Sequence, residues 1–225
     1  MDNTTGQTKP LSEASAPKPT RSDGAATRAS ILQSARRRLV EGGYANLNVR
    51  DIARDAGVNH ALIGYHFRGK QQLVLAVLDE ANKALLDRQS RMYQGTSKAS
   101  KQWQQACDFY DADLDSGFVH LLVELMAASF HDEELRGEFL PRLLTWHRLI
   151  ETAVTAFIEK SELDLPVSAQ AITAWIGWFW TGMEISMVLR IPEKDGHQRE
   201  ALKAVGTLLK LVERAGKSQP RGRKS

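Results

Sequence analysis

The side chains best suited to chemistry lie between Arg28 and Lys70, where cationic, amide and aromatic residues alternate with small ones. Arginine, lysine, amide and hydroxyl groups bind phosphate oxygens, and arginine also pairs with guanine in the major groove. This combination of residue types indicates DNA binding. The candidate DNA-contacting residues are Arg28, Asn48, Val49, Arg50, Asn59, His60, Ala61, Leu62, Gly64, Tyr65, His66 and Lys70.

Local signals predict two short helices joined by a tight turn, and these elements must position the candidate residues. Asn48 can cap the first helix, with Asp51 three residues later able to reach back in a variant of the capping box. Gly57 supplies the left-handed residue that ends this helix, and Asn59 caps the second. Two helices joined by a short glycine-containing turn form a helix-turn-helix, whose second helix enters the major groove.

The second helix of this motif should turn one face to the protein and the other to DNA. At about 100° per residue, Ile63 and Phe67 define its inward face. Arg50, from the preceding helix, can read guanine. The outward residues are Ala61, Gly64 and Tyr65, with His60 and Leu62 at the edges.

In this register the segment resembles the TetR (tetracycline repressor) family of bacterial regulators. The similarity extends upstream over Arg28 to Tyr44, which looks like the family's first helix. Many members carry Ser or Thr at the position of Asn59 and an aromatic residue at that of Gly64. A subgroup with the pattern N-x-x-x-I-x-Y-H-F is closer to this chain. The matching positions are Ile52-Ala53, Ala56-Gly57-Val58, Ile63, Tyr65-His66-Phe67, Lys70 and Leu73.

The resemblance implies an all-α protein with an N-terminal three-helix head and a C-terminal helical body that binds a small molecule and dimerises through its last two long helices. It also implies which residues mostly contact phosphates, and so position the head more than they select a sequence. These are Arg28, Asn48, Tyr65, His66 and Lys70.

Composition agrees with a DNA-binding regulator and argues against an enzyme. Residues 21–91 carry 12 Lys and Arg against 7 Asp and Glu, whereas residues 92–215 carry 12 against 18, which predicts a basic head on an acidic body. The single Cys107 cannot form an internal disulfide and the start of the chain lacks an apolar signal sequence, so we expect a cytoplasmic protein. The six histidines are scattered and no catalytic motif appears, so we expect no enzyme activity, metal or cofactor.

The chain is expected to divide into four parts. Residues 1–24 form a disordered polar tail, 25–70 the head, 71–215 the body and 216–225 a basic flexible tail. A helix at 71–92 is the only continuous link from head to body. The body reads as helical throughout, with helices at 98–116, 118–130, 133–160, 167–190 and 196–215. Pro141 can kink or divide the third of these.

The segment Ala171 to Leu189 is apolar on more than one face, and so must be covered on more than one side. A transmembrane helix is one solution, but Glu184 interrupts the segment and its aromatic residues cluster centrally. Burial between the body and a second subunit fits better, with the amphipathic last helix completing the interface. The expected interface residues are Ile172, Trp175, Phe179, Leu202, Val205, Leu209 and Val212.

The body should also enclose the small-molecule pocket that the resemblance implies. Its abundant Trp and Met residues suggest an apolar or aromatic ligand, because such pockets are mostly apolar with a few polar anchors. The candidate lining residues are Trp103, Cys107, Tyr110, Leu122, Met126, Phe130, Trp146, Ile150, Trp178 and Met183.

We interpret the chain as a ligand-responsive regulator, a repressor in preference to an activator, that binds an inverted-repeat operator as a homodimer. Two alternatives stay open at this point. One is a helical ligand-binding or interaction module that has lost operator recognition, which Gly64 supports best. The other is a membrane-tethered regulator, which rests on the tryptophan-rich segment.

Overall fold

The protein is all-α in the parts that the computed structural model describes, residues 21–95, 97–161 and 165–218. This confirms the fold class expected from the sequence. The head comprises α1 (Arg21–Gly42), α2 (Val49–Ala56) and α3 (Ala61–Phe67). The linker and body comprise α4 (Lys70–Gln94), α5 (Ala99–Asp115), α6 (Phe118–Ser129), α7 (Glu133–Ser161), α8 (Ala169–Val188), α9 (Glu193–Gly196) and α10 (Gln198–Ser218).

The expected local signals hold the helix-turn-helix in place. The Asn48 side chain accepts a hydrogen bond from the backbone N–H of Arg50 at 2.9 Å, and that of Asn59 accepts one from Ala61 at 2.9 Å. Gly57 ends α2 with φ of 68°, a left-handed conformation that glycine adopts without steric cost. Asp51, expected to complete a capping box, pairs instead with Arg38 and Arg54.

Three boundaries differ from the sequence-based expectation. α1 begins at Arg21, so residues 21–24, which we assigned to the disordered tail, are helical. α7 runs through Pro141 without a break, and the short helix α9 was not expected. The rest of the N-terminal tail, residues 1–20, and most of the C-terminal tail, residues 219–225, lie outside the described residues.

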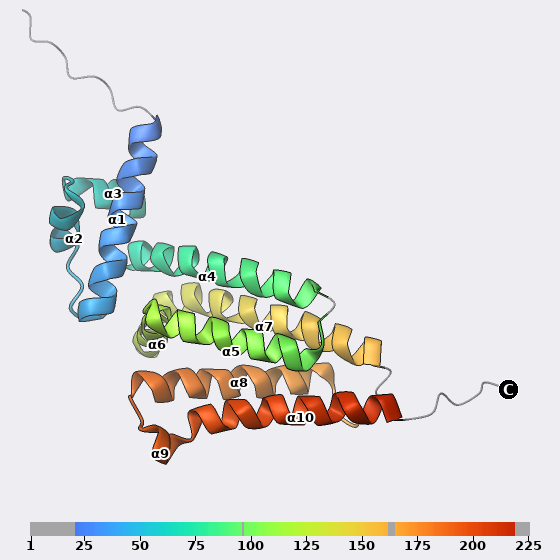
Figure 1. Ribbon diagram of the computed structural model, residues 1–225. Coiled ribbons are helices and arrows are strands. Elements are labelled where there is room, and N and C mark those ends of the chain that lie inside the picture. Colours follow the sequence, from blue (N-terminus) through green and yellow to red (C-terminus); the bar gives the residue numbers. More distant parts are fainter. Residues whose placement is uncertain (1–20, 96, 162–164, 219–225) are drawn as a thin grey trace, which may run out of the picture.

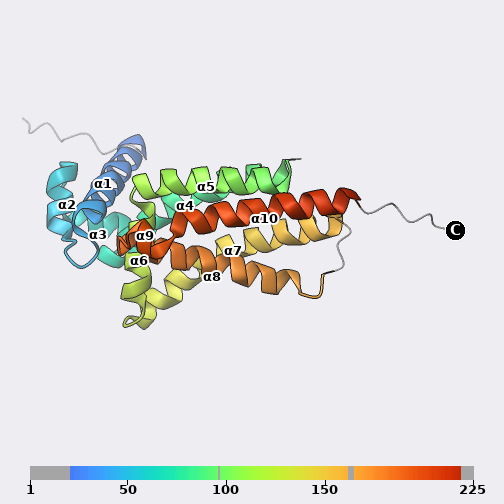
Figure 2. The ribbon, with the colours of Figure 1, turned by 60° about the horizontal axis from the view of Figure 1, so that its bottom comes forward.

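The body is a bundle of long helices that lies to one side of the head (Figure 1). α4 leads from the head into the bundle and packs against α7, while α7 packs against α8 and α5 against α10. Both views show α8 and α10 running side by side (Figures 1 and 2), and in Figure 1 they lie on the side of the body opposite α4. The two helices expected to dimerise therefore lie together on one face of the protomer.

A contact between α1 and α6 joins head and body in addition to the covalent link through α4. The backbone N–H of Tyr44 donates to the Glu124 carboxylate, and Arg36 donates to the carbonyl of Ser116 at 3.3 Å. A Cβ atom added to Gly117 would lie 2.4 Å from a methyl carbon of Val40, so this glycine is needed for the close approach. No local sequence pattern predicted this second connection.

We expect Gly117→Ala to destabilise the protein by roughly 1–3 kcal/mol, because the new methyl group overlaps Val40 and the residue has φ of 76°. Urea denaturation measures the loss. Adding Val40→Ala to the Gly117→Ala variant should restore the stability lost to the steric overlap, whereas the loss caused by backbone strain should remain. The control is Gly42→Ala, whose added Cβ would meet Asn46 only at 4.0 Å. Equal stability of the Gly117 and Gly42 variants would contradict this account of the junction.

Candidate nucleic-acid interface and body cavity

The helix α3 has one buried and one open face, as its spacing predicted. Ile63 and Phe67 are buried in the core of the head, whereas Tyr65 is 81% exposed. A Cβ atom on Gly64 would meet no other atom within 4 Å, so the surface around this residue is open. Of the remaining expected contact residues on this helix and its cap, His60, Ala61 and Leu62 are also exposed.

Two cations flank α3 and are held by aromatic rings. The Arg28 guanidinium carbon lies 5.1 Å from the ring centroid of Phe67, and the Lys70 ammonium lies 4.6 Å from that of Tyr44. Such contacts favour a fixed cation position. Partial burial lowers the pKa of Lys70 from its ordinary value. Arg28 therefore packs on α3, and Lys70, at the start of α4, packs on the segment between α1 and α2.

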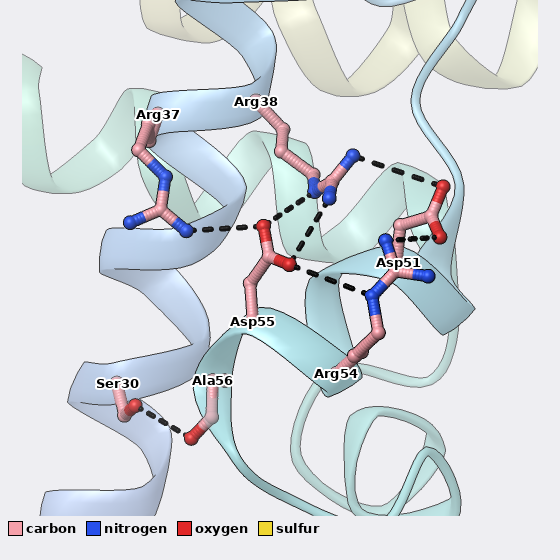
Figure 3. Close-up of polar contacts among 7 residues, drawn as sticks. All are labelled: Ser30, Arg37, Arg38, Asp51, Arg54, Asp55 and Ala56. Atoms are coloured by element: carbon pink, nitrogen blue, oxygen red, sulfur yellow. Dashed lines mark hydrogen bonds and ion pairs between the residues drawn. The ribbon is translucent and has the colours of Figure 1, made fainter.

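A network of ion pairs fixes α2 against α1 (Figure 3). The Asp55 carboxylate accepts hydrogen bonds from Arg37 at 3.0 Å and from Arg38 at 2.7 and 3.0 Å. Ser30 adds a hydrogen bond from its hydroxyl to the carbonyl of Ala56 at 3.1 Å. These arginines therefore belong to the framework of the head, and Asp55 is a positioning residue that the sequence analysis did not single out.

The body encloses an apolar cavity of about 200 Å³ between α4, α5, α7, α8 and α10. Of the expected pocket residues, Trp103, Trp146 and Ile150 line it. Ile172 and Leu209, which we assigned to the dimer interface, also face this cavity, because each lies on the inner side of its helix. Further lining residues include Gln89, Tyr93, Phe157, Ile176 and Trp180.

A smaller chamber of about 40 Å³ adjoins the cavity and is more polar. Two expected residues, Tyr110 and Leu122, line it together with Trp146. Asp113 and Glu184 also face this chamber. The sequence did not indicate Glu184 as a lining residue, although a glutamate in the middle of an apolar helix was a usable signal. The residues that line both chambers are Gln89, Ala106, Trp146 and Trp180.

The other five expected pocket residues do not line either chamber. Phe130 and Trp178 are 66% and 58% exposed, because they lie on the outer sides of α6 and α8. Met126 packs into the core beneath the head, and Met183 is buried within the body core. Cys107 faces a shallow groove between α5 and α10. A helical wheel gives the relative directions of residues but not which neighbouring helix each one meets, which explains these errors.

An apolar stripe covers the outer faces of α8 and α10. On α8 the exposed apolar residues are separated by three, seven and four positions, so they share one face of the helix. They are Trp175, Trp178, Ile185 and Leu189, and α10 contributes Leu208, Leu211 and Val212. Trp175 and Val212 were expected in this position.

Three other residues assigned to the dimer interface lie differently. Leu202 is buried within the protomer, and its carbonyl accepts a hydrogen bond from the Trp103 indole N–H at 2.9 Å. Phe179 is half-buried and packs against the aromatic core of the body. Val205 is also half-buried. The exposed stripe is therefore displaced around both helices from the set expected from the sequence.

The head matches a known family. Residues 31–77 match the family model described as "Bacterial regulatory proteins, tetR family". This part of the chain is therefore similar to the N-terminal domain of that family. Over 57 residues it is 47% identical to the HTH-type transcriptional repressor Rv3405c of Mycobacterium tuberculosis, an alignment that covers 25% of this chain and 30% of that protein. The chain thus matches less than a third of the length of this relative.

The fold of the head and the body together is also found in solved structures. A TetR-family regulator from Rhodococcus sp., described there as putative, aligns with a TM-score of 0.66 and 22% identity over 82% of this chain and 99% of its own. FadR from Bacillus subtilis, solved with stearoyl-CoA, aligns with a TM-score of 0.66 and 18% identity over 80% and 96%. At these identities the likeness establishes the fold alone.

The helix α8, for which the sequence left a membrane-spanning alternative open, does not meet the requirements for one. Among the helices of the described residues, none combines the length and apolar character needed to cross a bilayer. The apolar surface of α8 is divided between the cavity on its inner side and the exposed stripe on its outer side.

The ion-pair network of the head should make its stability depend on acid pH. Hydrogen bonds from Arg38 and Arg37 lower the pKa of Asp55 from 3.8 to about 2. A lowered pKa means that the folded state favours the charged form, so this stabilisation is complete above about pH 4 and is lost as the pH falls towards 2. Asp55→Asn should lower the urea midpoint at neutral pH, and this difference from the wild type should shrink between pH 4 and 2. A difference independent of pH would contradict the assignment.

Proposed function

We propose that this protein is a cytoplasmic transcriptional repressor that binds an inverted-repeat operator as a homodimer and releases it when a small molecule binds the body. The observation that carries the proposal is the open face of α3. This helix lies in the part of the chain that matches the TetR-family model, and it presents small residues and the exposed Tyr65 to solvent. Arg28 packs on it, and Lys70 follows it at the start of α4. No enzymatic step is part of this proposal.

In the proposed complex, α3 lies in the major groove and its contacts have two roles. Cations, amides and hydroxyl groups that bind phosphates position the head, whereas contacts with base edges select the sequence. We assign the first role to Arg28, Asn48, Asn59, Tyr65, His66 and Lys70. We assign the second role to Val49, Arg50, His60, Ala61, Leu62 and Gly64. Small side chains at 61 and 64 permit close approach to the bases.

The apolar stripe on α8 and α10 is the proposed dimer interface. A continuous apolar surface of this kind marks a protein interaction site, and two helices from each protomer would form a four-helix interface. Dimerisation also serves DNA recognition, since one short helix makes too few base contacts and a two-fold dimer reads two half-sites. Half-sites would be roughly 34–36 Å apart.

Ligand binding in the body can reach the heads by two routes. α4 lines the cavity with Gln89 and Tyr93 and continues directly into the head. α6 contacts α1 through Glu124 and Gly117. A change of a few ångströms in the separation of the two heads would prevent both from fitting successive grooves. The stearoyl-CoA bound to the structurally similar FadR supports an effector role for a body of this fold.

The first test of the proposal introduces a charge on the open face of α3. Gly64→Glu should leave the fold intact, because the position is open and glutamate favours helix more than glycine does. The added carboxylate should repel phosphates, block close approach and weaken operator binding at least about tenfold. The operator is selected by the wild-type protein from a random DNA pool, and binding is measured by fluorescence anisotropy.

The matched control is Gly137→Glu, which places the same side chain at an open, exposed glycine of α7, outside the head. It should bind the operator like the wild type. Equal binding by the two variants would show that α3 does not enter the groove. If the wild type enriches no sequence at all, the protein is a helical module without operator recognition.

The second test concerns the dimer. Trp175→Glu and Leu208→Glu each place a charge in the middle of the proposed interface, where its burial without a partner costs several kcal/mol. We expect monomers by light scattering at concentrations where the wild type is dimeric, together with loss of operator binding. Leu140→Glu, on an exposed site of α7 that is 45% accessible, should remain dimeric. Persistent dimers in both interface variants would mean that another surface pairs the protomers.

A further inference from the structure

Glu184 is an ionisable residue that the fold buries without a hydrogen-bond or ion-pair partner in the described part of the chain. It lies in α8, is 8% exposed and faces the smaller chamber of the body. Among the described residues, no side chain or backbone group forms a hydrogen bond or ion pair with its carboxylate. An unpaired buried carboxylate destabilises a protein, so its presence in a chamber wall calls for a ligand that supplies the missing partner.

Arg142 lines the chamber and Arg88 contacts the lining residue Asp113, and both arginines are already paired. The Arg88 guanidinium donates to Asp113, and Arg142 binds Asp79 at 2.7 and 3.0 Å. Burial, with Asp113 nearby, raises the pKa of Glu184 to about 8. The chamber therefore holds one acidic group in excess of its basic groups.

A neighbouring hydroxyl group also lacks a partner. The Tyr110 hydroxyl is buried in the same region, and within the described part of the chain it forms no hydrogen bond. Its pKa is raised, first by burial and then by the nearby charge of Glu184. A polar group of a ligand at Glu184 would thus be close to a second unsatisfied group.

The larger chamber favours cations over anions. Its wall contains the rings of Tyr93, Trp103, Trp146 and Trp180, and the Trp103 and Trp180 rings meet edge to face at 5.6 Å. Aromatic rings attract cations through their electron-rich faces. The indole N–H of Trp146 already donates to Gln89 at 2.8 Å, and that of Trp103 donates to the Leu202 carbonyl. These two indoles therefore offer no free donor to an anion.

We propose that the body binds a lipophilic organic cation, with its apolar part in the larger chamber and its ammonium group beside Glu184. This inference rests on the effector role proposed above and specifies the chemical class of the effector. The two chambers share Gln89, Ala106, Trp146 and Trp180, so a single molecule can occupy both. A dry cavity of roughly 150 Å³ accommodates benzene. The cavity of about 200 Å³ therefore suits one or two rings.

The test compares two probes of the same shape and different charge, benzyltrimethylammonium and the hydrocarbon neopentylbenzene. Binding to the full-length protein without DNA is measured by calorimetry or by quenching of tryptophan fluorescence. The wild type should bind the cation at least about tenfold more tightly than the hydrocarbon. Glu184→Gln should remove this preference and keep the affinity for neopentylbenzene, because glutamine has the same shape without the charge.

Controls distinguish this site from a general effect of charge. Glu80→Gln removes an exposed carboxylate on α4 and should leave both affinities unchanged. Equal affinity of the wild type for the two probes, tighter binding of the anion 3-phenylpropanoate, or no binding of the cation would overturn the proposal. The comparison of the two probes on the wild-type protein tests the proposal even if the Glu184 variant folds poorly. These titrations contain no DNA, so their outcome is independent of operator selection. A failure of the ligand proposal can therefore be distinguished from a failure of the DNA-binding proposal.

Discussion

One of the two hydrophobic core clusters extends from the head into the body, and its continuity is the constraint on which the proposed regulation depends. Phe118, Leu121 and Leu125 of α6 pack in the same buried cluster as Ile31 and Leu39 of α1. α4 contributes to this cluster along its first half. Closely packed cores shift between discrete arrangements more readily than they deform continuously. A displacement of α4 or α6 in the body must therefore move α1, and with it α3.

The helix α8 serves two surfaces at once. Its inner side lines the cavity with Ile172, Ile176 and Trp180, whereas its outer side exposes Trp175 and Trp178. A helix that is apolar on several faces must bury each of them, and the helices of one protomer bury only the inner side of α8. This arrangement places the proposed effector within one helix thickness of the proposed dimer partner. A ligand that shifts α8 would thus act on the spacing of the two heads as well as on α4.

Buried polar groups divide into structural and unsatisfied sets. Arg88 and Asp113, Trp146 and Gln89, and Ser100 and Glu213 each form pairs that connect different helices of the body. Such pairs fix the packing of one helix on another. Glu184 and the Tyr110 hydroxyl lie outside this set, although they occupy the same region. Buried polar groups without partners are expected at functional sites, where ligand binding has been favoured over the stability of the free protein.

The amino-acid sequence by itself determined the head almost completely. Asn48, Gly57 and Asn59 act through hydrogen bonds and backbone conformations that involve neighbours a few residues away, so their effect can be read from spacing. The same holds for the inward and outward faces of α3, which follow from helical periodicity.

Only the tertiary structure decided the arrangement of the body. Helical periodicity separates apolar from polar faces, but α8 is apolar nearly all round, and no local signal says which side meets the cavity and which remains exposed. Leu202, Ile172 and Leu209 therefore moved from the expected interface into the protomer, while Trp178 moved from the expected pocket to the surface. The contact of Glu124 with Tyr44 and the burial of the unpaired Glu184 carboxyl group both depend on residues far apart in the chain. Such contacts form only when long-range packing brings helices together, which is why the structure alone revealed them.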